Sequence, residues 1–120
     1  MDNAPIMRCA IYARFSTNMQ RAASIEDQIR QCRVYVAQQG EYEIVENYVR
    51  YDKALSGATT RGRDGLQFLI DAAKQEPRSF DVVLVDDTSR LARNTEDSLR
   101  TVAIFQFYSR IVALSIMPAR

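Results

Sequence analysis

Histidine is absent from all 120 residues of the chain. A serine that attacks a carbonyl group normally relies on a nearby base such as histidine, so the usual hydrolase arrangement is excluded. The two cysteines, Cys9 and Cys32, have no histidine with which to form a metal-ligand cluster. Because both fall within apolar patterns, they are predicted to be core thiols.

Lysine is nearly as scarce, since Lys53 and Lys74 are the only two in the chain. The remaining positive charges are arginines, whose planar side chain is suited to a two-pronged grip on phosphate or carboxylate. The formal net charge is only +1, so bulk composition does not indicate a nucleic-acid binder. The positions of the arginines are therefore more informative than their number.

Long apolar runs are also missing, as no stretch approaches the ~18 residues of a membrane-spanning helix. The segment 1–7 lacks the charged-then-apolar order of a signal peptide. We therefore expect a cytoplasmic, reduced protein with no membrane partner. The length, with 47% hydrophobic residues, predicts one domain over residues 1–120 with a flexible lead-in at 1–7.

Strand-like and helix-like segments alternate along the chain. Ser24 is a predicted N-cap and Gly40 a predicted helix stop, and the last helix is expected to turn Leu99, Val102, Ala103 and Phe107 inward. The predicted strands are 9–13, 42–51, 81–86 and 111–116. The first predicted helix begins after Ser24, and the other two span 64–74 and 95–109. The alternation predicts an α/β three-layer sandwich, in which a largely parallel sheet of about four strands is flanked by helices and the strand 81–86 is central.

Three predicted strand exits carry serine or arginine. In open α/β sheets, ligands bind outside the carboxyl ends of the strands, so these side chains are expected to gather there. The candidates are Arg14 and Ser16, then Arg61 and Arg63, then Arg90 and Arg93. A serine surrounded by guanidinium groups favours phosphoryl transfer, which needs mainly in-line positioning and neutralisation of the non-bridging oxygens.

Simpler interpretations stay open at this stage. A serine after a strand is most often a loop or capping residue. Arg90 and Arg93 could form a solvated face or pair with Asp86, Asp87 or Asp97. The segment 57–62 lacks the Gly-Lys-Ser/Thr ending of a nucleotide-phosphate loop. A phosphate-accepting aspartate at the end of strand 81–86 would need an acidic metal site, whereas the neighbouring loops bring arginines.

Several ordered blocks resemble the catalytic domain of the serine recombinases, the group of resolvases, invertases and large serine integrases. The block from Tyr12 to Thr17, Tyr-Ala-Arg-Phe-Ser-Thr, is similar to the nucleophile motif of that family, and Ser24-Ile-Glu-Asp-Gln28 to the start of its first helix. Asp52-Lys-Ala-Leu-Ser-Gly57, continuing to Arg63-Asp-Gly-Leu66, is similar to a second block. Val85-Asp-Asp-Thr-Ser-Arg90-Leu-Ala-Arg93-Asn94 is similar to a third.

The resemblance implies recombination of DNA through a serine nucleophile. Ser16 would form a covalent 5′-phosphoserine link and release a 3′ hydroxyl, without ATP or a metal ion. Arg14, Arg90 and Arg93 would hold the phosphate, with help from Arg63. Tyr12, Gln28 and Asp52 would organise the pocket, and Arg61 is a further candidate contact to DNA phosphate. The implied partners are DNA and further copies of the chain, as dimers that pair into tetramers, with no small-molecule substrate.

Two departures from the family pattern accompany the resemblance. Ser89 stands where many members have an acid before the arginine, which leaves Asp86 or Asp87 as its substitute. The chain also ends at Arg120, before the long helix of the family's dimer interface and the DNA-binding region, so we expect a fragment that holds the catalytic core. The alternative is a catalytically degenerate homologue that serves only as an interaction module for DNA or protein.

Overall fold

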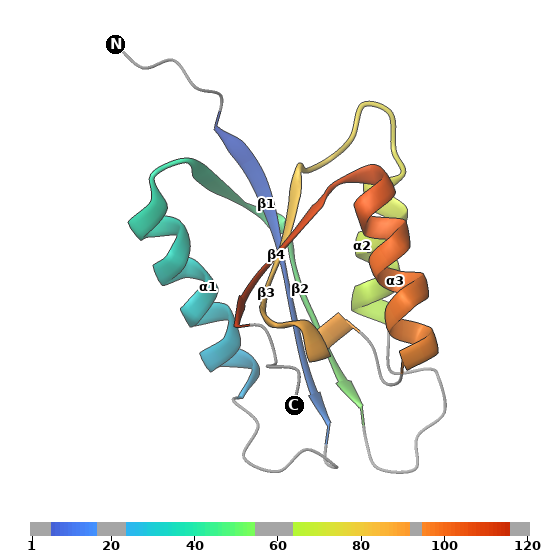
Figure 1. Ribbon diagram of the computed structural model, residues 1–120. Helices are drawn as coiled ribbons and strands as arrows, with labels where there is room; N and C mark the ends of the chain where they lie inside the picture. Colours follow the sequence, from blue (N-terminus) through green and yellow to red (C-terminus); the bar gives the residue numbers. More distant parts are fainter. Residues whose placement is uncertain (1–5, 17–23, 55–63, 92–94, 116–120) are drawn as a thin grey trace.

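The computed structural model describes residues 6–16, 24–54, 64–91 and 95–115 (Figure 1). Within these ranges, the chain alternates strictly between strands and helices. In order, the elements are β1 (Met7–Ser16), α1 (Ile25–Gln39), β2 (Tyr42–Ala54), α2 (Asp64–Ala73), β3 (Val82–Asp87), the 3-10 helix η2 (Thr88–Leu91), α3 (Thr95–Tyr108) and β4 (Arg110–Ser115). All four predicted strands and all three predicted helices are confirmed.

The four strands form one sheet in the order β2-β1-β3-β4, and every neighbouring pair is parallel. Parallel neighbours need a crossover connection, and here the helices provide it. Figure 1 shows α1 on one face of the sheet and α2 with α3 on the other. The predicted three-layer fold is therefore confirmed, and β3 lies inside the sheet together with β1.

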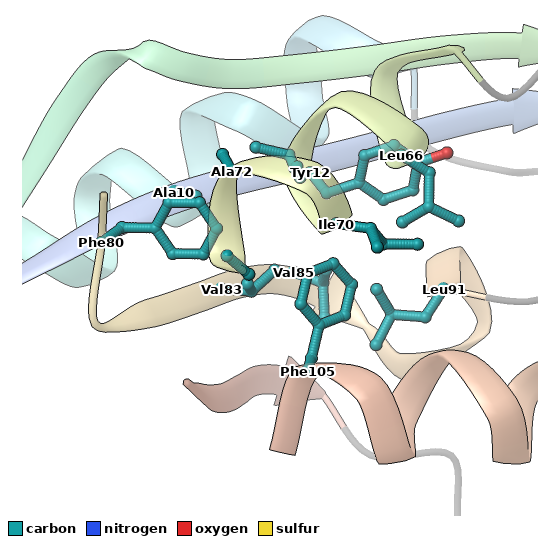
Figure 2. Packing of buried hydrophobic residues seen from close by; sticks show 12 residues of the cluster. Ala10, Tyr12, Leu66, Ile70, Ala72, Phe80, Val83, Val85, Leu91 and Phe105 are labelled. Atoms are coloured by element: carbon teal, nitrogen blue, oxygen red, sulfur yellow. The ribbon is translucent and has the colours of Figure 1, made fainter. Parts of the chain in front are cut away.

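Two apolar clusters fill the spaces between the layers. On one face, Ile11 and Leu84 pack with Cys32 of α1. On the other, the cluster beneath α2 and α3 includes Tyr12 of β1 and Phe105 of α3, both labelled in Figure 2. Successive strand residues point to opposite faces, so β1 and β3 supply side chains to both clusters and must be apolar throughout their buried middle parts.

Both cysteines are buried and free, which confirms the prediction of core thiols. Burial raises the pKa of the Cys9 thiol to about 11. Burial also raises the pKa of Cys32 to about 12, with a further contribution from the negative charge of Asp86. Thiolate is the reactive form, so both side chains behave as small apolar residues.

The ends of α1 follow the sequence prediction. The hydroxyl of Ser24 accepts a hydrogen bond of 3.0 Å from the Asp27 amide. At the other end, Gly40 adopts φ 73°, a left-handed conformation that glycine tolerates best, and donates its amide to the Val36 carbonyl. Both boundaries were readable from sequence because each depends on contacts within a few residues.

The first two strands are longer than predicted. The parallel pairing of β1 with β2 continues through Arg14 with Asp52 and ends with Ser16 opposite Ala54. The backbone pairing of β1 with β2 therefore continues beyond the apolar residues from which the ends of the two strands were predicted. As a result, Arg14 and Asp52 lie in strands instead of loops, on backbone that the sheet holds in place.

The inward face of α3 was predicted correctly at Val102, which packs against the core, and wrongly at Ala103 and Phe107. Phe107 is 80% exposed and Ala103 is also exposed, whereas Thr101 and Phe105 are buried. Apolar residues surround this helix on several sides, so their spacing does not select a single face. The side chain of Leu99 lies outside the described part of the chain. Among the described residues, no helix is long and apolar enough to cross a membrane.

Candidate active site

The carboxyl ends of β1, β2 and β3 meet at one edge of the sheet because these strands are parallel. This edge brings together the described residues that were predicted to form the site. Tyr12, Arg14, Asp52 and Arg90 are buried there, as is Gln28 of α1. Ser16 is the last residue of β1 and pairs with Ala54 at the same edge.

Three predicted site residues, Arg61, Arg63 and Arg93, lie outside the described residues, as does the side chain of Ser16. The structure therefore describes five of the nine predicted side chains and the backbone position of the serine. Those five come from β1, α1, β2 and η2, elements that are far apart in the sequence.

Asp52 accepts three hydrogen bonds near the carboxyl end of β2. Its carboxylate accepts a 2.7 Å hydrogen bond from the Tyr12 hydroxyl, one of 2.7 Å from the Gly65 amide and one of 3.0 Å from the Leu66 amide. The last two amides belong to the first turn of α2, where a negative charge is favoured by the helix dipole. Asp52 thus joins the end of β2 to β1 and to the start of α2.

Gly65 allows this close approach. A Cβ atom at that position would lie 2.6 Å from the Tyr51 carbonyl oxygen and 3.1 Å from Asp52 Oδ1. Real Cβ atoms essentially never come within 3.0 Å of such neighbours. The glycine is therefore required by space at the β2–α2 contact.

Replacing Gly65 with alanine is expected to lower the free energy of unfolding by about 1–3 kcal/mol, the usual cost of overpacking. Helix propensity alone would favour alanine by roughly 0.5–1 kcal/mol, so the sign of the change identifies the cause. Urea unfolding of Gly65→Ala measures it. Gln67→Ala, at an exposed position of the same helix, is the control and should stay within about 0.5 kcal/mol of the parent protein.

Gln28 connects α1 to the end of β1 through two hydrogen bonds. Its amide oxygen accepts from the Arg14 backbone amide and its amide nitrogen donates to the Arg14 carbonyl, each at 3.0 Å. An amide side chain is the group that can do both at once. Because Gln28 holds the backbone at Arg14, it fixes the base from which the arginine side chain extends.

Arg90 is held by a buried ion pair with Asp86. Its Nε donates to Asp86 Oδ1 at 2.8 Å and its Nη2 to Oδ2 at 3.2 Å. The two side chains are only 7% and 8% exposed. Of the two simple interpretations of Arg90, the ion pair with Asp86 is therefore correct and the solvated face is not.

The described residues include no group of three or more His, Cys, Asp or Glu side chains that could hold a metal ion. The acidic residues of this edge are instead engaged with the protein itself. Asp52 binds α2 and Tyr12, and Asp86 binds Arg90. The arrangement supplies guanidinium groups, and these are suited to binding an anion.

Comparison with known proteins agrees with this geometry. Residues 9–114 match the family described as the resolvase N-terminal domain. This chain is a serine recombinase catalytic domain of the resolvase family. Among curated protein sequences, none matches it.

Solved structures extend the match to three dimensions. The C-terminal catalytic domain of ISC1926 TnpA, an IS607-like serine recombinase, is 31% identical with a TM-score of 0.71, covering 92% of this chain and 72% of that one. The N-terminal catalytic domain of TP901-1 integrase is 30% identical with a TM-score of 0.69, covering 89% and 76%. A serine recombinase from Sulfolobus solfataricus shares the fold, at 19% identity and a TM-score of 0.51, covering 96% and 72%.

The family confirms the resemblance found in the sequence and excludes the phosphate-accepting aspartate domain. Two features of this resolvase domain were incompletely anticipated. One is the burial of the Asp86–Arg90 pair, and the other is the need for a residue without a side chain at Gly65. Each depends on neighbours from other elements. The four-residue spacing of Asp86 and Arg90 was a usable signal for the pair but not for its burial.

Proposed function

We propose that this resolvase domain cuts and rejoins DNA at specific sites, with Ser16 as the nucleophile. The observation that carries the proposal is the fixing of Arg14 and Arg90 at the sheet edge where β1 ends in Ser16. Gln28 holds the backbone of the first arginine and Asp86 the side chain of the second. A phosphate placed at this edge would meet the Arg90 guanidinium, whose orientation is set before DNA arrives, and an arginine at position 14 whose backbone is held in place.

In the proposed reaction, the Ser16 hydroxyl loses its proton and its oxygen attacks the phosphorus of a phosphodiester. The new bond joins Ser16 to the 5′ phosphate, the bond from phosphorus to the 3′ oxygen breaks, and that oxygen leaves as a 3′ hydroxyl after taking up a proton. Arg14, Arg90 and Arg93 neutralise the non-bridging oxygens, with Arg63 and Arg61 as additional contacts. The reverse attack by a 3′ hydroxyl rejoins the exchanged ends.

The phosphoserine link conserves the phosphoester bond through strand exchange, so the proposed reaction uses neither ATP nor a metal ion. The proposed partners of the protein are DNA and further copies of the same chain. The proposed reaction takes place in the cytoplasm. The proposed catalytic domain covers residues 1–120.

The proposal predicts a covalent protein–DNA adduct that depends on Ser16. Full-length protein is mixed with DNA that carries its crossover sites, denatured rapidly with detergent, and separated by electrophoresis. We expect an adduct joined to the 5′ end, with the modified peptide containing Ser16. Ser16→Ala should form none, because no other atom replaces the attacking oxygen.

Ser79→Ala is the matched control, since Ser79 precedes β3 at the opposite edge of the sheet, and it should form the adduct at the parental rate. An adduct that persists in Ser16→Ala would contradict the assignment of the nucleophile. Absence of any adduct from the parent protein, with DNA binding intact, would instead support the degenerate homologue that acts only as an interaction module.

A further inference from the structure

The pair of Asp86 and Arg90 bridges the point where β3 gives way to η2. Asp86 is the penultimate residue of β3, and Arg90 lies in the 3-10 turn that follows directly. Two N–H groups of the guanidinium meet two oxygens of one carboxylate. Such two-pronged contact fixes both the plane and the direction of the guanidinium, which a single hydrogen bond would not do.

Because the Asp86–Arg90 pair is buried, it is expected to add little to the stability of the fold. Both side chains are almost fully removed from solvent, and the cost of stripping water from two charges offsets much of their attraction. Apolar residues of similar size often serve a fold equally well. The ion pair stands at the edge of the sheet where Arg14 and the end of β1 also lie, so its position coincides with the proposed phosphate site.

We propose that Asp86 is a positioning residue for the recombination reaction and that it acts through Arg90. This inference rests on the proposed function and selects Asp86 from the two acids that the sequence left as substitutes at this motif, giving it a positioning role through its contact with Arg90. Asp86 holds the guanidinium in the orientation needed at the phosphate undergoing transfer. The acid that pairs with Arg90 lies four residues before it, whereas Ser89 occupies the position directly before it.

The charge of Asp86 gives this role a distinctive signature. A carboxylate beside Arg90 reduces the net positive charge at the site, so its removal should leave DNA binding unchanged or slightly stronger. The same removal frees the guanidinium to turn away from its reactive orientation, and small misplacements of a catalytic group can cost about 100-fold in rate. Binding and cleavage are therefore expected to change separately.

The test compares full-length parent protein with Asp86→Asn, an isosteric change that removes the charge, and Asp86→Glu, which keeps it. The rate of adduct formation at saturating DNA and the Kd for the same DNA are measured in parallel with thermal unfolding. We expect Asp86→Asn to lower the rate by about 10- to 100-fold with a Kd equal to or below the parental value. Asp86→Glu should recover part of the rate.

Asp71→Asn is the matched control, because Asp71 lies exposed on α2 and accepts a hydrogen bond from Gln67; its rate and Kd should equal the parental values. An unchanged rate in Asp86→Asn would overturn the inference. Loss of binding and cleavage together, in proportion to a loss of folded protein, would overturn it as well. If the parent protein forms no adduct, the proposed function itself fails, and that result is distinct from both.

Discussion

Replacing Asp52 with alanine is expected to lower the free energy of unfolding by about 2–5 kcal/mol, the largest loss predicted for any polar residue of the site. The substitution removes the hydrogen bond between the buried Tyr12 hydroxyl and Asp52, and it removes the carboxylate from the amides of Gly65 and Leu66. The buried hydroxyl group that loses this hydrogen bond is no longer compensated for its removal from water, which costs about 1–2 kcal/mol or more. Loss of the carboxylate from the two amides resembles the loss of a helix cap, which costs about 1–2 kcal/mol or more.

Such a loss would be a large share of the stability of an ordinary domain, which is about 5–15 kcal/mol. Urea unfolding followed by circular dichroism measures it. Asp71→Ala, at an exposed position on α2, removes the same side chain and should change stability by about 0.5 kcal/mol or less. Equal effects at the two positions would show that Asp52 does not join β1, β2 and α2 as its contacts indicate.

Replacing Gln28 with glutamate should cost about 2–4 kcal/mol at neutral pH although the two side chains have nearly the same shape. A carboxylate can still accept from the Arg14 amide, but it cannot donate to the Arg14 carbonyl, with which Gln28 makes its second hydrogen bond. Two acceptor oxygens would then face each other in a buried site, and the backbone that carries Arg14 would lose half of its attachment to α1.

Acidic pH should relieve this defect. When protonated, the new carboxyl group regains one donor, so the folded state favours its protonated form and raises its pKa above the ordinary value of about 4.3. The folded protein then binds more protons than the unfolded chain. Stability is therefore highest below the unfolded pKa and is lost as pH rises through the folded pKa.

Unfolding of Gln28→Glu by urea is measured at neutral pH and near pH 4.5, each time beside the parent protein. The stability deficit should shrink at the lower pH. Gln31→Glu introduces the same group at an exposed position of α1 and should show only a small deficit at both pH values. A deficit in Gln28→Glu that is independent of pH would contradict the reciprocal hydrogen bonds to Arg14.

The outline of the fold was predictable because it depends on short-range patterns. The boundaries of α1 follow from the capping residues Ser24 and Gly40, and the buried run of β3 from its apolar residues. The face of α3 was predicted only in part, since Val102 packs against the core but Phe107 is exposed and Phe105 buried. Where apolar residues lie all around a helix, the face that is buried depends on which neighbours it meets, and periodicity carries no such information.

The same division applies to the site. The sequence alone determined the chemical groups and their order: arginines with no histidine, a serine at the end of the first strand, and acids near the ends of the second and third. Only the tertiary structure decided how those groups are held. Tyr12 meets Asp52 from 40 residues away, Gln28 reaches the backbone of Arg14, and Asp86 and Arg90 are buried as a pair. These contacts depend on strand register and on the packing of helices against the sheet, which are set by long-range pairing and cannot be obtained from local spacing.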